Sequence, residues 1–261
     1  MKVGIIGAGN MGQALIRGFL LTNALPPKNI LVAEKDPEKA KQVKRLGATP
    51  TTIQELAKNS DVIIIAVKPA NVKEVLEELK PAKNKLLISI AAGISTSFIE
   101  KNSSGRAIRV MPNLCAGVGE MAACYSLGKR AGKKDEEVAK KLFSPLGLFL
   151  KIDEKLMDAV TGVSGSGPAF LLHVIQAMAA AGKEAGLPEE VSLKLAAQTA
   201  IGAGVLAISS ESSPEEIIQK ICTPKGTTIE GMKVLEERKV AEAVKGAVEA
   251  AIRRARELSA G

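Results

Sequence analysis

The 261-residue sequence is poor in aromatic side chains, which make up 2% of it, with one Tyr and no Trp. Proteins that bind single-stranded nucleic acid stack bases on aromatic platforms, so this class of binding is disfavoured. The hydrophobic core must be built from aliphatic residues instead. The formal net charge is +8, but basic and acidic residues alternate along most of the chain, as in 35–39. This alternation favours a solvated surface over a nucleic-acid patch.

Cysteine and histidine are also scarce. Cys115, Cys124 and Cys222 are widely spaced, no CxxC pair occurs, and His173 is the single histidine. We therefore expect no metal site and no disulfide framework, as in a reducing compartment. We expect neither a cleavable leader nor an apolar run long enough to span a bilayer. We expect a cytoplasmic protein that binds neither membrane nor nucleic acid.

Residues 1–155 alternate short, wholly apolar runs with amphipathic segments. Runs of this kind are typical of strands that are covered on both faces. The alternation predicts an α/β domain with a Rossmann-type, doubly wound, mostly parallel sheet. The expected strands are 2–6, 30–33, 61–67, 86–90, 106–111, 121–126 and 148–152, and the expected helices are 11–21, 37–46, 52–58, 72–79, 97–100 and 135–143.

Residues 156–261 lack strand patterns. The segment 168–185 is apolar nearly all round, 191–208 is rich in Ala and Gly, and 239–258 carries an apolar stripe with helical spacing. A helix that is apolar on every face must be buried on every face, which so small a domain rarely achieves alone. We therefore favour an all-helical C-terminal dimerisation domain over the alternative of a self-contained bundle.

The segment Gly7-Ala8-Gly9-Asn10-Met11-Gly12 matches G-x-G-x-x-G between an expected strand and an expected helix. This context is the one that dinucleotide binding requires. Gly7 permits the tight turn, Gly9 leaves room for the pyrophosphate, and Gly12 allows close packing of the helix on the sheet. The helix N-terminus offers free N–H groups to the phosphates. The expected cofactor-binding residues here are Gly7, Ala8, Gly9, Asn10, Met11 and Gly12.

The end of the second expected strand bears on the choice of cofactor. Glu34 lies 22 residues after Gly12, near the spacing of an acid that bonds the ribose hydroxyls, which favours NADH. Lys35 follows directly and can meet a 2′-phosphate, which favours NADPH. An ordinary surface lysine is an equally good interpretation of Lys35, so both cofactors stay open.

Two further loops combine glycine with hydroxyl side chains before helical segments, at 162–168 and at 222–228. Loops of this kind present backbone N–H groups to anions such as a substrate carboxylate. Simple helix capping by Ser166 and by Thr227 or Thr228 explains the same residues equally well.

Six segments carry further motifs, in order along essentially the whole chain: residues 7–14, 66–69, 89–93, 109–113, 162–170 and 223–228. Together they resemble the Δ1-pyrroline-5-carboxylate reductase family of proline biosynthesis. The most specific are Gly-Val-Ser-Gly-Ser-Gly-Pro-Ala-Phe at 162–170 and Thr-Pro-Lys-Gly-Thr-Thr at 223–228.

The resemblance implies an oxidoreductase that reduces the cyclic imine L-1-pyrroline-5-carboxylate to L-proline with NADPH or NADH. It implies a Rossmann domain at 1–155 and a helical substrate-binding domain at 156–261 that interlocks with a second copy, giving a homodimer that can assemble into rings. Ala66, Val67, Lys68 and Pro69 would line the cofactor cleft. Thr228 would hydrogen-bond the ring nitrogen as the catalytic residue. The substrate-binding residues would be Ser166, Glu211, Gly226, Thr227 and Thr228.

Two positions depart from the family pattern. Lys225 stands where the family usually has the first of two glycines, so it can change the backbone angles of the loop or place a cation near the substrate. Ile53 stands where relatives often place a polar residue against the adenosine.

Two other functions stay open. One is another two-domain NAD(P)-dependent reductase of small carboxylates, such as a hydroxyacid dehydrogenase, although the nearest candidate lysine, Lys183, fits poorly. The other is a non-catalytic dinucleotide-binding protein.

Overall fold

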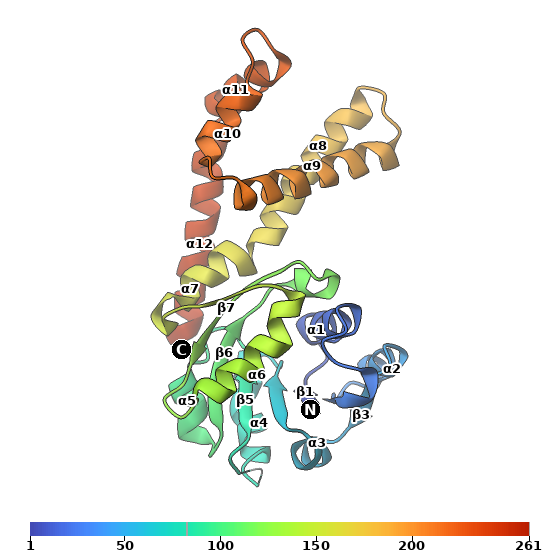
Figure 1. Cartoon of the computed structure of the whole chain (residues 1–261), viewed down its shortest axis with the longest axis vertical. Coiled ribbons are helices and arrows are strands. Elements are labelled where there is room, and N and C mark those ends of the chain that lie inside the picture. Colours follow the sequence, from blue (N-terminus) through green and yellow to red (C-terminus); the bar gives the residue numbers. More distant parts are fainter. Residues whose placement is uncertain (82, 261) are drawn as a thin grey trace. The chain divides into compact units, whose positions relative to one another are not determined.

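The computed structural model describes residues 1–81 and 83–260 (Figure 1). The chain forms two compact units. The first comprises Met1–Ser166 with Ala250–Gly261, and the second comprises Gly167–Glu249. The first unit contains an eight-stranded sheet with its covering helices, and the second unit consists of helices.

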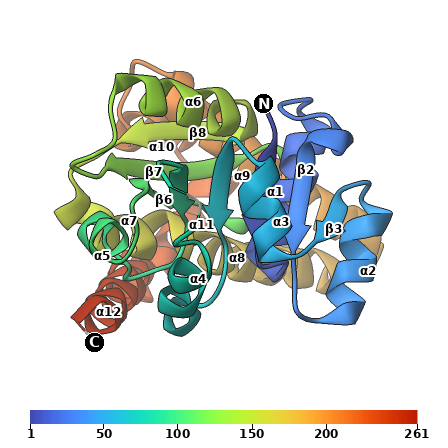
Figure 2. The ribbon, with the colours of Figure 1, turned by 90° about the horizontal axis from the view of Figure 1, so that it is seen from below.

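The sheet has the order β3-β2-β1-β4-β5-β6-β7-β8. Neighbouring strands are parallel except β6 and β7, which are antiparallel. This arrangement confirms the predicted Rossmann-type, mostly parallel α/β sheet (Figure 2). The strands are β1 Val3–Ile6, β2 Ile30–Ala33, β3 Thr49–Thr51, β4 Val62–Ile65, β5 Leu86–Ser89, β6 Arg106–Met111, β7 Met121–Leu127 and β8 Gly147–Lys151.

The strand order reverses between β1 and β4. The chain leaves β1 toward β2 and β3, then returns to place β4 on the other side of β1, with Val3 paired to both Ile30 and Val62. Such a switch point leaves a crevice at the carboxyl ends of the two central strands, where open α/β sheets bind ligands.

Helices cover both faces of the sheet, which explains why β1, β4 and β5 are buried at every residue. Leu15 and Phe19 of α1 and Phe143 of α6 belong to one hydrophobic cluster, whereas Leu56 of α3 and Leu76 of α4 belong to another. Successive residues of β4 alternate between the two clusters, as a pleated strand requires. The helices are α1 Asn10–Leu21, α2 Pro37–Arg45, α3 Ile53–Asn59, α4 Val72–Glu78, α5 Thr96–Asn102 and α6 Lys133–Phe143.

The edge strand β3 was not expected from the sequence. It is three residues long, contains Pro50 and is largely exposed, so it lacks the apolar run that identifies the other strands. Proline is tolerated in a sheet mainly at such edges, because it cannot donate to the ladder.

The second unit contains α8 Gly167–Glu184, α9 Glu189–Ser209, α10 Pro214–Ile221 and α11 Thr227–Glu237. The last helix, α12 Val240–Ala260, starts in this unit and ends in the first one. The long helices expected at 168–185, 191–208 and 239–258 are therefore present.

The end of α12 is fixed to the first unit by a polar cluster. The Ser259 hydroxyl donates to Asp158 over 2.8 Å, and Asp158 lies 3.6 Å from the buried Arg109 guanidinium. Glu154 lies 3.9 Å from the same guanidinium and accepts hydrogen bonds from the backbone and hydroxyl of Thr96. Gly93 has a positive φ, and a Cβ there would lie 2.7 Å from the Leu258 carbonyl oxygen. This close approach explains why glycine stands at position 93.

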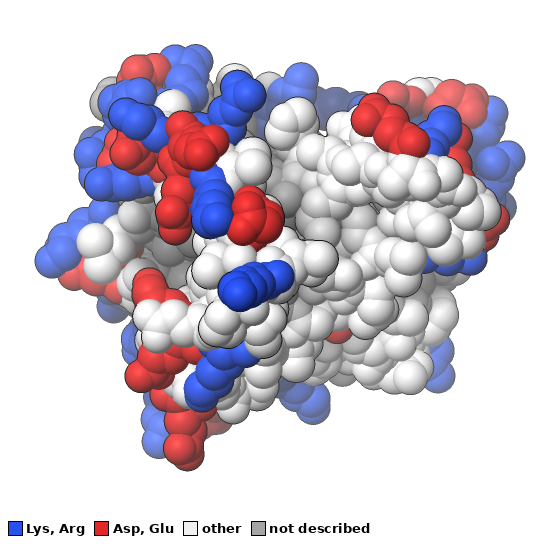
Figure 3. Space-filling view, turned by 90° about the horizontal axis from the view of Figure 1, so that it is seen from above, with Lys and Arg blue, Asp and Glu red and all other residues white. Residues whose placement is uncertain are grey.

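The second unit exposes large apolar side chains. Leu171, Leu172 and Val205 are each about 60% exposed, and Ile208 is 84% exposed. Figure 3 shows a broad area without charged residues on one face of the molecule. The helical segments Glu154–Glu184 and Glu189–Ser209 are long and apolar enough to cross a membrane by length and composition. The expectation that no run reaches that length was therefore wrong, and this surface needs a covering.

A buried phenol ties α6 to β7 and β8. The Tyr125 hydroxyl donates to Glu136 over 2.7 Å, and the ammonium groups of Lys151 and Lys140 lie 3.0 and 3.1 Å from the same carboxylate. The Tyr125 hydrogen bond, followed by those of the two lysines, lowers the pKa of Glu136 from 4.5 to about 2.

We expect Glu136→Gln to weaken the dependence of the free energy of unfolding on pH in acid solution. A carboxyl whose pKa is lower in the folded state stabilises the fold above its unfolded pKa and loses that contribution as pH falls through the folded pKa. At pH 7 the variant should therefore be less stable than wild type by about 1 kcal/mol, and the difference should vanish between about pH 5 and about pH 2. Urea unfolding across this range measures it. Glu137→Gln, at an exposed neighbouring position, is the control. A Glu136→Gln deficit that stays constant across the range would contradict this account.

Candidate active site

The fingerprint loop at the carboxyl end of β1 requires glycine at two positions for steric reasons. Gly7 has φ +99°, and a Cβ there would lie 2.7 Å from the Ala66 carbonyl oxygen at the end of β4. A Cβ on Gly12 would overlap the Gly7 carbonyl oxygen. Strand, turn and helix therefore meet with no room for side chains, as the sequence pattern predicts.

Gly9 differs from its two neighbours in the motif, because a Cβ there meets nothing within 4 Å. Gly9 is the N-cap of α1 and provides no side-chain cap, so the first N–H groups of the helix lack an intrahelical partner. Open space in front of free N–H groups at a helix N-terminus suits a pyrophosphate. The Gln13 amide donates to the Ala8 carbonyl over 2.9 Å and steadies the loop from the helix side.

A cavity of about 550 Å³ opens beside this loop. Seven of the twelve predicted cofactor residues line it: Gly7, Gly9, Glu34, Lys35, Ala66, Val67 and Lys68. Asn10 lies just outside it, and Ala8, Met11, Gly12 and Pro69 are not among its lining residues. Ala8 and Gly12 still shape the cavity, because they fix the backbone of the loop.

Glu34 is held in place at the end of β2. Its carboxylate accepts hydrogen bonds from the Ala8 N–H over 2.6 Å and from the Asp36 N–H over 2.9 Å. Lys35 donates to Glu74 of α4 over 2.7 Å, and this contact raises the pKa of the lysine. Both side chains that bear on cofactor choice therefore line the cavity, and both have partners within the chain.

The remaining wall of the cavity was missed by the sequence analysis. Asn71, the N-cap of α4, and Glu74, Val75 and Glu78 within the helix line it. Their spacing of three, four and seven residues places them on one helix face, just after the loop that follows β4. That spacing is the signal that could have identified them. Thr51, Thr52, Ile53 and Gln54 also line the cavity, with Ile53 buried where relatives were expected to place a polar residue.

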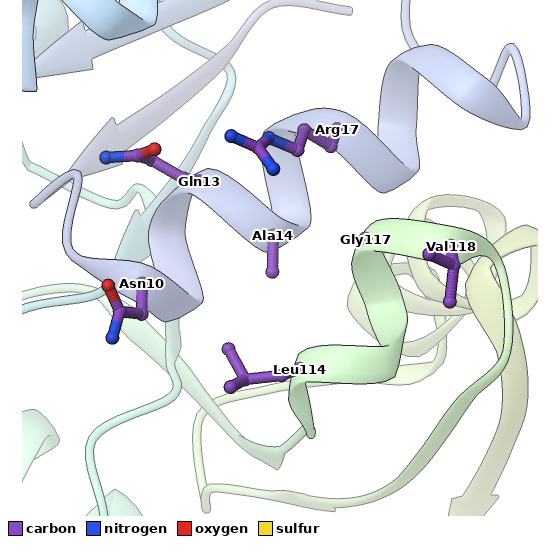
Figure 4. A pocket seen from close by; sticks show the side chains of 7 residues that line it. All are labelled: Asn10, Gln13, Ala14, Arg17, Leu114, Gly117 and Val118. Carbon is purple, nitrogen blue, oxygen red and sulfur yellow. The ribbon is translucent and has the colours of Figure 1, made fainter. Parts of the chain in front are cut away.

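A second hollow of about 300 Å³ lies between α1 and the turn Leu114–Val118. Figure 4 shows Ala14 facing Leu114 and Gly117, with Asn10, Gln13 and Arg17 along the helix. It shares no lining residue with the first cavity, but it begins at Asn10, the residue after Gly9. The N-terminus of α1 is therefore hollowed on both sides.

The carboxyl end of β6 is joined to the glycine-rich segment at 162–167. The buried Asn113 amide donates to the Ser164 carbonyl over 3.0 Å. Thr161–Gly165 forms a π-helical turn, and the Ser166 N–H donates to the Thr161 carbonyl over 2.9 Å. Short π-helical turns occur frequently at functional sites. Ser166 is the last residue of this stretch of the first unit.

The other predicted substrate residues belong to the second unit. Glu211 is exposed in the connection between α9 and α10. Gly226 is the N-cap of α11 without a side-chain cap, and Thr227 and Thr228 are its first two residues. The threonines therefore do not cap this helix, and its first N–H groups are available to an anion.

Lys225 adopts φ +59°, the left-handed conformation that glycine adopts at no cost. Gly226 is also constrained, because a Cβ there would overlap the Thr223 hydroxyl. The loop thus keeps a glycine-like backbone at position 225 in spite of the lysine side chain.

The site fits a nicotinamide dinucleotide. The switch-point crevice, the strained glycine turn, the open space at Gly9 and the uncapped helix are the features that such a cofactor needs. Fold and site together define an NAD(P)-dependent oxidoreductase of the Rossmann class.

Comparisons with known proteins narrow this class. Residues 154–258 match the family model described as pyrroline-5-carboxylate reductase dimerisation, and residues 2–93 match that of NADP oxidoreductase coenzyme F420-dependent. Pyrroline-5-carboxylate reductase of Arabidopsis thaliana is 42% identical over 99% of this chain and 95% of its own length. The enzyme of Methanosarcina acetivorans is 40% identical over 98% and 97%. The Plasmodium falciparum pyrroline carboxylate reductase, solved with NADP bound, superposes with a TM-score of 0.91 at 31% identity, over 99% and 98% of the two chains.

The chain belongs to the pyrroline-5-carboxylate reductase family. Its helical part matches the dimerisation domain of that family, and the match includes α8 and α9 with their exposed apolar side chains.

We expect Gly9→Val to abolish dinucleotide binding while the fold persists. The side chain would occupy the open space in front of the helix N-terminus, so the affinity for NADH should fall at least about tenfold, with Tm within about 4 °C of wild type. Gly12→Val is the matched variant, and it should lower Tm strongly because its Cβ overlaps backbone. Fluorescence titration and thermal melts measure both effects. Unchanged affinity in Gly9→Val would exclude the loop as the cofactor site.

We expect the stability of variants at position 225 to depend on how well the new residue tolerates a positive φ, and not on the charge of its side chain. A β-branched residue is strained at positive φ, so Lys225→Val should destabilise the protein by about 1–2 kcal/mol. Lys225→Gly removes the strain at some cost in unfolded-state entropy, so its stability should equal or exceed that of wild type by up to about 1 kcal/mol. Urea unfolding compares them. Equal destabilisation by both variants would show that the lysine side chain itself matters.

Proposed function

We propose that this protein is a pyrroline-5-carboxylate reductase, which reduces L-1-pyrroline-5-carboxylate to L-proline with NADPH or NADH. The observation that carries the proposal is the likeness to reductases of that name over 99% of the chain. The dinucleotide loop and the uncapped, threonine-bearing start of α11 supply what the chemistry needs.

We assign the cofactor to residues 1–155, and the substrate and the second subunit to residues 156–261. Gly7 to Gly12, Glu34, Lys35 and residues 66–69 bind the dinucleotide, which supplies the hydride when bound. The ring nitrogen of the imine must carry a proton for its carbon to be electrophilic enough to accept that hydride. Positioning the two rings face to face is the main task of the protein.

The substrate carboxylate is bound at Gly226 by the backbone N–H groups that begin α11 at Thr227, where the helix dipole favours an anion. Thr228 places a hydroxyl one residue further on, and it donates a hydrogen bond to the ring nitrogen or accepts one from it. A neutral hydroxyl is a weak acid, so Thr228 orients the nitrogen and is not its sole source of protons. Ser166 and Glu211 complete the proposed substrate site.

The dimerisation domain supports a homodimer, and we extend this to a ring of dimers, by analogy with the family. A small-molecule substrate, a cytoplasmic location and the absence of nucleic-acid or membrane partners belong to the same proposal. Coverage by a second copy offers α8 and α9 an alternative to lipid, since the matched dimerisation model spans both helices.

The proposal is tested by following the oxidation of NADH and NADPH with and without pyrroline-5-carboxylate. Turnover that depends on the imine supports it. Binding of dinucleotide without turnover would favour a non-catalytic role, and turnover of a hydroxy acid instead would favour a different reductase.

In the same assay we expect Thr228→Ala to lower kcat/KM for the imine about ten- to a hundredfold, the cost of one hydrogen bond to a polar ring nitrogen in a partly dry site. The affinity for NADH should stay within about twofold, because the substitution leaves the fingerprint loop intact. Tm should also change little, since Thr228 does not cap α11. Thr227→Ala is the matched control, because its proposed contact is through the backbone. Wild-type kinetics in Thr228→Ala would remove the residue from the site.

A further inference from the structure

The cavity beside the fingerprint loop has lysines on its rim that are already paired with acids. The Lys35 ammonium lies 2.7 Å from Glu74, and the Lys39 ammonium lies 3.5 Å from Asp36. Lys35, Lys39 and Glu74 all line the cavity. Each of these two cations therefore has an acidic partner within the chain before any ligand arrives.

The acids on this rim are differently anchored. Glu34 is fixed by two backbone N–H groups, and Asp36 caps α2 by accepting from the N–H groups of Glu38 and Lys39. Glu74 accepts a hydrogen bond from the Lys35 ammonium, and its side chain is more than half exposed. Asp36 contacts Lys39 within the first turn of its own helix, whereas Glu74 holds Lys35 from a separate element, α4.

The adenosine ribose of a dinucleotide is expected at the end of β2, next to Glu34. A 2′-phosphate there would approach the fixed carboxylate of Glu34. Lys35 is the adjacent residue whose positive charge can offset the resulting repulsion. Lys35 can do so only if it leaves Glu74 on α4. Glu78, one turn further along α4, adds negative charge to the same wall and also raises the pKa of Lys35.

We propose that Glu74 is a specificity-determining residue, which holds Lys35 on α4 and thereby makes the site favour NADH over NADPH. This inference rests on the proposed function, because it requires the cavity to hold the adenosine end of the cofactor. Exposed ion pairs are weak, so a 2′-phosphate can break this one. The discrimination is accordingly several-fold rather than absolute.

The test uses two adenylate fragments of the cofactors that differ only in the 2′-phosphate, namely 5′-AMP and 2′,5′-ADP, titrated calorimetrically into the full-length protein. Glu74→Gln should raise the affinity for 2′,5′-ADP about three- to fivefold and leave that for 5′-AMP within about twofold. Glu77→Gln is the matched control, because it removes the same charge from the same helix outside the cavity lining.

A double-mutant cycle separates release of the lysine from simple relief of repulsion. In a Lys35→Ala background, Glu74→Gln should have no effect on 2′,5′-ADP. The ratio of kcat/KM for NADPH to that for NADH should rise with Glu74→Gln in parallel with the affinities.

Three outcomes would overturn the inference: an equal gain from Glu77→Gln, no gain from Glu74→Gln, or an undiminished gain when Lys35 is absent. Failure of wild type to bind 5′-AMP at all would instead remove the cofactor from this cavity, and the proposed function with it.

Discussion

The close approach of backbone to backbone at the carboxyl ends of β1 and β4 is the constraint on which the site depends. Gly7 turns the chain at positive φ against the Ala66 carbonyl, and Gly12 lets α1 start directly over that turn. Each additional atom here would push the helix away from the sheet. Because nothing fills the space in front of Gly9, the N-terminus of α1 faces a cavity instead of a side chain. A steric requirement of the fold thereby produces an anion-binding site.

The sequence predicts the sheet well because most strands are buried on both faces, which leaves unbroken apolar runs such as Val62–Ile65. It does not predict β3, whose Pro50 and exposure are edge features. The glycine roles follow from the motif, but the hydrogen bonds that fix Glu34 do not, since they depend on where the loop brings the Ala8 N–H. The wall formed by α4 was missed because the spacing of its residues identifies a helix face, and only their place just after the loop that follows β4 indicates that this face meets the cavity.

The second unit has more apolar side chains than the packing of its own helices buries. The Ser192 hydroxyl donates to the Ala179 carbonyl over 2.7 Å, and a Cβ on Gly182 would overlap Ser192, so α8 and α9 pack closely through small residues. That contact uses one face of each helix and leaves Leu172 and Val205 exposed. A self-contained bundle would have buried such side chains. The dimerisation domain explains why the all-round apolarity of these helices is compatible with an ordinary charged surface elsewhere.

The net charge of the chain does not predict whether the cavity binds NADH or NADPH more tightly. A formal charge of +8 attracts any dinucleotide, because both cofactors are anionic and the attraction acts at long range. It cannot separate NADH from NADPH, since these differ only at the ribose, and salt screens charges that lie more than about 8 Å away. Two of the lysines that line the cavity have acidic partners: Lys35 has Glu74, and Lys39 has Asp36. A chain with an excess of positive charge can thus present a cavity in which these two cations are paired locally, so the total charge does not predict how a 2′-phosphate is bound.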